Sequence, residues 1–127
     1  MAGSARPELT GGVELKVKRV HDDASPGDGF RVLVDRLWPR GLTKERAAVG
    51  LWAKDAAPST ELRRAFHGGG MSWDEFEAAY RAELAANPAV AELREAVARH
   101  PVATLLYGVH DPARNHAVIL REALLAP

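Results

Sequence analysis

The chain has 127 residues, a length typical of one compact domain. Hydrophobic residues make up 46% of it and charged residues 27%, a globular composition that excludes a disordered, collagen-like or coiled-coil chain. Seventeen Lys and Arg residues balance seventeen Asp and Glu residues, so the net charge is zero. No overall field therefore draws the protein onto nucleic acid or an anionic membrane.

The cysteine content and the apolar runs indicate where the protein resides. The sequence contains no cysteine, which excludes disulfides, thiolate nucleophiles and cysteine zinc sites. Its first residues lack the apolar stretch of a secretory signal, and its longest apolar runs are much shorter than the ~18 residues that span a bilayer. We therefore expect a cytoplasmic protein that has no membrane partner.

The N-terminal third of the chain predicts a tail and two strands. Residues 1–12 are rich in Gly, Ala, Ser and Pro without periodicity, which predicts a flexible tail before a domain that spans residues 13–127. Alternating apolar and polar residues at 13–18 predict the first strand, and a cluster of turn residues at 21–29 predicts a loop. The β-branched apolar run 30–35 predicts a buried second strand.

Helix signals fill the middle of the chain. Four helix starts are indicated, by Thr43, by Ser59, by the capping box from Ser72 to Glu75, and by Asn87 before Pro88. A third apolar strand run follows at residues 102–107, and Asp111-Pro112 predicts the N-cap and first position of a final helix that ends near Leu125.

This order of elements predicts an α/β fold, with one small domain in which a mostly parallel short sheet packs with about five helices. Strands two and three should be parallel, because helices separate them. The direction of strand one relative to strand two stays open, since the nine residues 21–29 are too few for a helical crossover.

Two segments are candidates for a ligand site. In an open α/β sheet, ligands bind beyond the carboxyl ends of the strands, and this rule selects residues 35–41 and 110–116. In the first segment, the guanidinium groups of Arg36 and Arg40 suit a phosphate or a carboxylate, and Trp38 can stack on a base or another ring. The alternative is that the charged residues form ion pairs and the tryptophan is a core residue.

His116 is the candidate for proton transfer in the second segment. It should lie in the first turn of the final helix, where the helix dipole favours the neutral ring that can accept a proton, although a structural histidine is the alternative. Asp111 is either the helix cap or a catalytic carboxylate, and Asp55 is a further candidate carboxylate. We expect Lys54 and Asn115 to contribute to ligand binding. The segment matches no metal-ligand spacing, so no metal or other cofactor is predicted.

These residues resemble one known family. The resemblance rests on Asp-Arg-Leu-Trp-Pro-Arg-Gly at 35–41, and also on Lys18-Arg19-Val20, residues 54–63, Trp73, Phe76, Tyr80, Leu105 to Tyr107, and Asn115 to Ala117. Over residues 14–125 the chain is similar to the YeaO-like branch of the bacterial domain-of-unknown-function family DUF488. Longer members of that family carry a helix between strands one and two and cysteines near positions 107 and 115. This chain has neither cysteine, so only His116 carries over. The resemblance implies the fold and no established activity.

The sequence therefore predicts a pocket for a small anionic or nucleotide-like molecule, in an enzyme or a binding domain. A competing hypothesis is a regulatory or interaction protein that binds nucleic acid or a protein partner through residues 31–64, which hold eight basic and four acidic side chains. A concave site that joins Trp38, Arg40 and His116 would favour the small molecule, whereas a flat basic face would favour nucleic acid.

Overall fold

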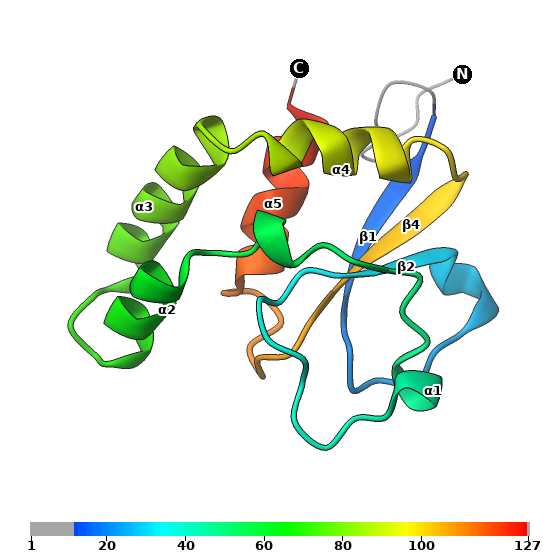
Figure 1. The fold of residues 1–127 in the computed structure, drawn as a ribbon, viewed down its shortest axis with the longest axis horizontal. Coiled ribbons are helices and arrows are strands. Elements are labelled where there is room, and N and C mark those ends of the chain that lie inside the picture. The colour runs from blue at the N-terminus through cyan, green and yellow to red at the C-terminus, as the bar shows by residue number, and fades with distance from the viewer. Residues whose placement is uncertain (1–11, 127) are drawn as a thin grey trace.

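The computed structural model describes residues 12–126, so the predicted tail, apart from Gly12, lies outside the described residues. Four parallel strands form one sheet in the order β1-β4-β2-β3 (Figure 1). The strands are β1 (Glu14–Arg19), β2 (Phe30–Leu33), β3 (Leu51–Trp52) and β4 (Val102–Tyr107). The predicted α/β class is confirmed, as is the parallel pairing of the strand runs now labelled β2 and β4.

The sheet order also settles the direction of the first strand. β1 is parallel to β2, but the two are not neighbours, because β4 lies between them and pairs with both. The edge strand β3 was not predicted, since two residues are too short to show a period.

In the described part of the chain, five α-helices accompany the sheet, together with two short 3₁₀ turns. The helices are α1 (Lys44–Ala47), α2 (Thr60–His67), α3 (Trp73–Ala85), α4 (Ala89–Val97) and α5 (His116–Leu125), and the turns are η1 (Pro26–Asp28) and η2 (Lys54–Ala56). The predicted caps Thr43, Ser59 and Ser72 each accept the backbone N–H three residues on. No helix within residues 12–126 has the length and apolarity needed to cross a bilayer.

The start of the last helix differs from the prediction. α5 begins at His116, and its cap is Asn115, whose side chain accepts the N–H of Val118. Asp111 instead closes a separate turn by accepting the N–H groups of Ala113 and Arg114. The Asp-Pro signal is therefore a turn signal here, and His116 still lies in the first turn of the helix as predicted.

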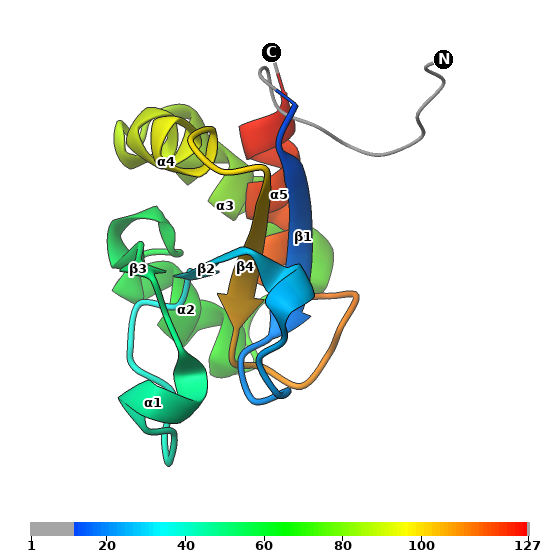
Figure 2. The same ribbon diagram turned by 90° about the vertical axis from the view of Figure 1, so that its right-hand side faces the viewer.

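Each face of the sheet packs against a different part of the chain. Successive side chains of a strand point to opposite faces, so Leu105 lies in the large core cluster with α2 to α5, whereas Leu106 lies in a smaller cluster with Val20 and Leu42. Figure 2 shows α3 and α5 on one side of β1 and β4 and the turn η1 on the other.

A short crossing joins β1 to β2 over the second face of the sheet. The hydroxyl of Thr104 in β4 donates to the carbonyl of Asp28 at 2.7 Å, which fixes η1 on this face. Gly29 then passes the start of β4, with a φ of 63° and a position where a Cβ would lie 2.3 Å from the carbonyl oxygen of Val102. Only glycine allows this approach.

Candidate functional site

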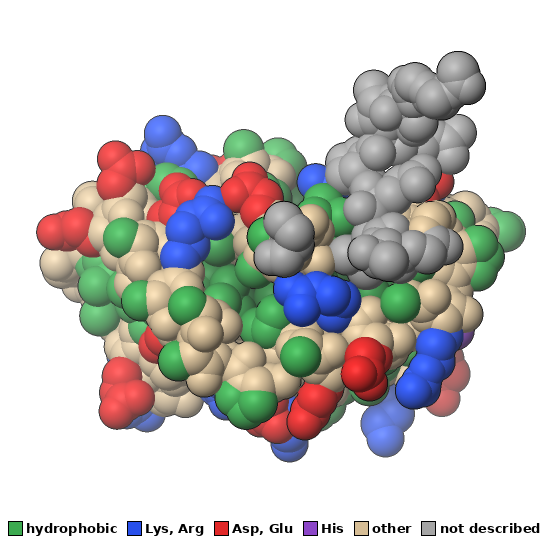
Figure 3. Space-filling model, turned by 90° about the horizontal axis from the view of Figure 1, so that it is seen from above, with side chains coloured by type: hydrophobic (Ala, Val, Ile, Leu, Met, Phe, Trp, Pro, Cys, Tyr) green, Lys and Arg blue, Asp and Glu red, His purple; other side chains and the backbone are tan. Residues whose placement is uncertain are grey.

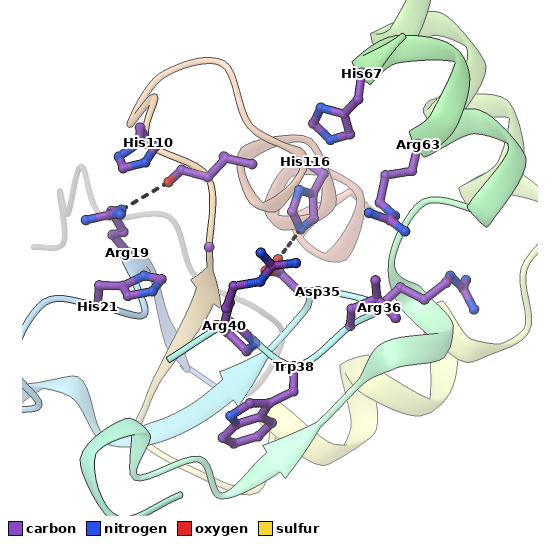
Figure 4. A pocket seen from close by; sticks show the side chains of 14 residues that line it. Arg19, His21, Asp35, Arg36, Trp38, Arg40, Arg63, His67, His110 and His116 are labelled. Carbon is purple, nitrogen blue, oxygen red and sulfur yellow. Dashed lines mark hydrogen bonds and ion pairs between the residues drawn. The ribbon is translucent and has the colours of Figure 1, made fainter. Parts of the chain in front are cut away.

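A cavity of about 340 Å³ opens where the carboxyl ends of β1, β2 and β4 meet. Residues 35–40 line it after β2, and residues 108–110 line it after β4, which confirms that the segments following these two strands face each other. His116 contributes from the start of α5, and α2 forms a further wall (Figure 4). The site is concave rather than flat.

Basic side chains dominate the lining. The arginines are Arg19, Arg36, Arg40 and Arg63, and the histidines are His21, His67, His110 and His116. Among the described residues that line it, Asp35 is the one carboxylate. Within residues 12–126, no group of three or more His, Asp or Glu side chains is arranged to hold a metal ion. We call this space the cationic cavity.

Asp35 and His116 form a pair at the base of the cationic cavity. The His116 Nε2 atom lies 2.8 Å from Asp35 Oδ1 and 3.1 Å from the carbonyl oxygen of Val34. Both neighbouring oxygens are acceptors, so Nε2 carries the hydrogen. This hydrogen is directed at the Val34 carbonyl, and the buried Asp35 Oδ1 atom has no hydrogen-bond partner among the described residues. The two side chains are 12% and 18% exposed, which limits the competition from water.

Gly108 makes room for this pair. A Cβ at position 108 would lie 2.6 Å from Asp35 Oδ2, closer than any tolerated contact. Gly108 directly follows β4, so the end of one strand accommodates the carboxylate that follows its neighbour β2. The sequence predicted only an ion pair for Asp35. Its contact with His116 could not be predicted, because the space above Gly108 exists only in the fold.

The arginines of the cationic cavity differ in what they already bind. Arg36 donates to the carbonyls of Pro58 and Ala57 at 3.0 and 3.1 Å, and its side chain runs away from the cavity centre in Figure 4. Arg40 and Arg63 have no hydrogen bond or ion pair with any described residue, and Arg63 Nε is buried without a partner. These two arginines are therefore available for an anion.

Arg19 is partly available as well. Its Nε donates to the carbonyl of Val109 at 3.2 Å, which holds the side chain against the segment after β4 and leaves the terminal nitrogens of the guanidinium without a described partner (Figure 4). Arg19 ends β1 and His21 follows it, so the strand-end rule would have selected them if the direction of β1 had been known. Arg63 and His67 required knowledge of how α2 packs.

Trp38 has a position set largely by the protein itself. Its Nε1 donates to the carbonyl of Leu42 at 2.7 Å, and its ring meets Trp52 edge to face with centroids 5.5 Å apart. The ring also packs against the smaller core cluster while lining the cationic cavity. Trp38 thus packs partly as a core residue and also lines the cationic cavity, and its stacking on a ligand ring stays a prediction.

Asp111 and Asn115 lie beside the cationic cavity and serve the backbone. The N–H groups of Arg114 and Ala113 lower the pKa of the exposed Asp111 carboxyl, which favours its ionised form. Asn115 is 2% exposed, donates to the carbonyl of Asp111 at 2.9 Å and caps α5. Both residues position the start of α5, and therefore His116.

Lys54 and Asp55 are not brought to the cationic cavity. They line a different cavity beside α4, where the Lys54 Nζ atom lies 5.3 Å from the centre of the Trp52 ring. The sequence predicted Lys54 as a ligand-binding residue and Asp55 as a candidate carboxylate of the same pocket, but η2 directs both towards the far edge of the sheet beyond β3. Neither can partner His116, whose carboxylate is Asp35.

The basic stretch 31–64 does not form one face. Arg31 is 5% exposed and binds Asp28 and the carbonyl of Ala47. The remaining basic residues lie on separate elements: Arg36, Arg40 and Arg63 at the cationic cavity, Lys44 and Arg46 on α1, Lys54 on η2, and Arg64 on α2. On the face above α4, acidic and basic side chains are mixed (Figure 3).

The fold and this site define a small parallel α/β protein with a cationic cavity at the carboxyl ends of its strands. Comparison with known proteins then identifies its family. Residues 14–127 match the family model described as "Inactive DUF488-N3 subclade", and the chain belongs to this family as a YeaO-like member.

The curated relatives are themselves uncharacterised. The chain is 42% identical over 112 residues to the uncharacterised protein YeaO of Escherichia coli K12, an alignment that covers 88% of this chain and 97% of YeaO. It is 44% identical over 110 residues to uncharacterised proteins of Mycobacterium tuberculosis H37Rv and Mycobacterium bovis, with 87% of this chain and 92% of each relative covered. No solved structure matches significantly.

Proposed function

We propose that this protein is a binding domain for a small phosphorylated molecule, whose phosphate lies in the cationic cavity. The observation that carries the proposal is the charge of the lining: four arginines surround one carboxylate, and that carboxylate already faces His116. Guanidinium groups bind phosphate through paired N–H donors, and such charge-assisted bonds are about twice as strong as neutral ones.

Arg40 and Arg63 are the principal ligand-binding residues in this proposal. Neither has a described protein partner, so neither must give up an interaction when an anion enters. Arg19 adds its terminal nitrogens, and the N-terminus of the ten-residue helix α5 faces the same space with its positive dipole end. Arg36 supports the wall from behind.

Binding rather than catalysis is the role that the site favours. The Nε2 atom of His116 faces the acceptor oxygens of Val34 and Asp35, so Nε2 is the donor and a proton would be taken up only at Nδ1. Asp111, the other carboxylate beside His116, is engaged by backbone N–H groups. A family model described as inactive agrees with this role. Should a reaction occur here, His116 and Asp35 are the pair that would handle the proton.

The experiment is calorimetric titration of inorganic phosphate and of adenosine 5′-monophosphate into wild-type protein and the variant Arg40→Lys. The substitution keeps the charge and removes the fork, and we expect about tenfold weaker binding, the value of one charge-assisted bond. Arg99→Lys is the matched control, because Arg99 is exposed just before β4, at the opposite end of the sheet.

Three results would contradict the proposal. Equal affinity of wild type and Arg40→Lys would remove the forked contact, and the absence of binding by either phosphate compound would remove the anion site. A matching loss in Arg99→Lys, which also keeps its charge, would show that the effect is not specific to the cationic cavity.

A further inference from the structure

A second cavity adjoins the cationic cavity and differs from it in character. It has a volume of about 480 Å³ and shares Arg63, His67, Val109, His110 and His116 with the first. Its other walls include the rings of Phe66 at the end of α2 and Trp73 at the start of α3. The two cavities therefore adjoin along these shared side chains, one with a cationic lining and the other with an aromatic wall.

Three aromatic rings build the wall of the second cavity. Phe66 lies 4.6 Å from Phe76 and 6.0 Å from Trp73, measured between ring centroids, and Trp73 stacks on Phe76 at 5.4 Å. Phe76 is only 4% exposed and belongs to the core. Phe66 and Trp73 are half-buried at the margin of that core, so part of each ring remains uncovered at the cavity.

This wall is better placed for a ligand ring than Trp38. The Trp38 indole is held by the carbonyl of Leu42 and by the edge contact with Trp52. The indole nitrogen of Trp73, by contrast, has no described hydrogen-bond partner. Arg63, Phe66 and His67 lie on one turn of α2. Arg63 and His67 line both cavities, so they connect the aromatic wall to the cationic cavity.

We propose that the ligand is a phosphate ester that carries a planar aromatic ring, of the nucleoside monophosphate class, with its ring against Phe66 and Trp73. The inference rests on the proposed function, because the phosphate must occupy the cationic cavity for the ring to reach the second one. Aromatic rings pack favourably in offset or edge-to-face geometry, and a base stacks on a protein ring whatever its hydrogen-bonding pattern.

The first test compares three ligands by calorimetry: adenosine 5′-monophosphate, ribose 5-phosphate and inorganic phosphate. We expect the adenosine compound to bind wild-type protein about tenfold more tightly than ribose 5-phosphate, the value of one stacked base. Phe66→Leu keeps an apolar side chain and removes the ring face. It should weaken adenosine 5′-monophosphate by about that factor and leave ribose 5-phosphate unchanged.

Phe30→Leu is the matched control for this substitution. Phe30 is also half-buried and stacks on His100 with ring centroids 4.0 Å apart, but it lies at the start of β2, away from both cavities. It should leave the affinities for all three ligands unchanged. A loss of adenosine 5′-monophosphate affinity in Phe30→Leu equal to that in Phe66→Leu would overturn the proposal.

The second test follows the wild-type protein and needs a variant only to assign one signal. The indole N–H signals of the three tryptophans are followed by NMR during titration, with Trp73→Phe used for assignment. Adenosine 5′-monophosphate should shift the Trp73 signal through its ring current, whereas ribose 5-phosphate should not. A ring shift confined to Trp38 would place the base in the cationic cavity and overturn the proposal.

The outcomes separate this inference from the proposed function. If both organic phosphates bind with equal affinity and the Trp73 signal is unmoved, the phosphate site stands and the aromatic subsite is wrong. If none of the three ligands binds, the proposed function fails and the aromatic subsite fails with it.

Discussion

Asp28 is a buried carboxylate that joins three parts of the chain. Lys18 in β1 and Arg31 in β2 donate to its oxygens, and so does the backbone N–H of Ser25. Burial alone would raise the pKa of Asp28, but the N–H of Ser25 and the cations of Lys18 and Arg31 outweigh it and lower the pKa from 3.8 to about 2. The carboxylate therefore stays ionised at every ordinary pH.

This depressed pKa predicts a loss of stability in acid. The ionised carboxylate stabilises the fold above pH 3.8, and the contribution disappears as the pH falls towards 2, where the folded protein also takes up the proton. It amounts to about 2 kcal/mol. Urea unfolding at pH 6 and pH 2 should show a smaller difference in unfolding free energy for Asp28→Asn than for wild type. The control Asp22→Asn changes an exposed carboxylate and should show the same difference in unfolding free energy as wild type. If Asp28→Asn also showed the wild-type difference, Asp28 would not be the source of the acid sensitivity.

Gly108 is the second residue whose role can be isolated. The Cβ of an alanine at position 108 would lie 2.6 Å from Asp35 Oδ2. Gly108→Ala must therefore displace that carboxylate from His116. We expect a cost of about 1–3 kcal/mol in unfolding free energy, as for other overpacked sites. In the background Asp35→Ala the same substitution should cost much less, because the clashing group is gone. An equal cost in both backgrounds would show that the carboxylate is not the obstacle.

At the scale of elements, α5 connects the backbone to the site. Its first residue is His116 and its cap is the buried Asn115, so the cap sets the direction in which the imidazole leaves the helix. The sequence predicted a final helix with His116 in its first turn, but it assigned the cap to Asp111. Turn and helix N-terminus use the same residue types, because both need a short side chain that accepts backbone N–H groups.

Asn115→Ala should therefore affect both stability and binding. Loss of the cap and of the bond to the Asp111 carbonyl should lower the unfolding free energy by about 1–2 kcal/mol. Phosphate should also bind more weakly, because the first turn that carries His116 loosens. Asn87→Ala is the control. The Asn87 side chain accepts the N–H of Ala89 and donates to the carbonyl of Asp55, and it lies outside the cationic cavity. It should lower stability alone; undiminished phosphate affinity in Asn115→Ala would contradict the link.

At the scale of the whole molecule, the sheet order explains what the sequence could and could not predict. The strand-end rule found the segments after β2 and β4 because both strands are apolar runs with turns behind them. The rule missed Arg19 because β1 has no local signal of its direction. The sequence placed Lys54 and Asp55 in the pocket because β3, which separates them from it, is too short to recognise. Arg63 depends on how α2 packs, which is a tertiary property.

The central place of β4 makes the crossing at Gly29 the critical point of this topology. β1 and β2 fold from the N-terminal part of the chain, yet β4, the last strand, lies between them, and residues 20–29 must cross its start. At Gly29 a Cβ would meet the Val102 carbonyl at 2.3 Å, and the φ of 63° adds backbone strain. Neither the backbone of β4 nor that of the crossing can shift without disturbing the pairing on both sides.

Gly29→Ala should consequently destabilise the protein far more than alanine at another glycine of positive φ. We expect a loss of at least about 3 kcal/mol, from strain and a backbone clash together. Gly41→Ala is the matched control: its φ is 77°, but its Cβ position is open, so only the strain of about 1–2 kcal/mol applies. Unfolding free energies in urea measure the difference. Equal losses in the two variants would mean that the close approach to β4 does not constrain the fold.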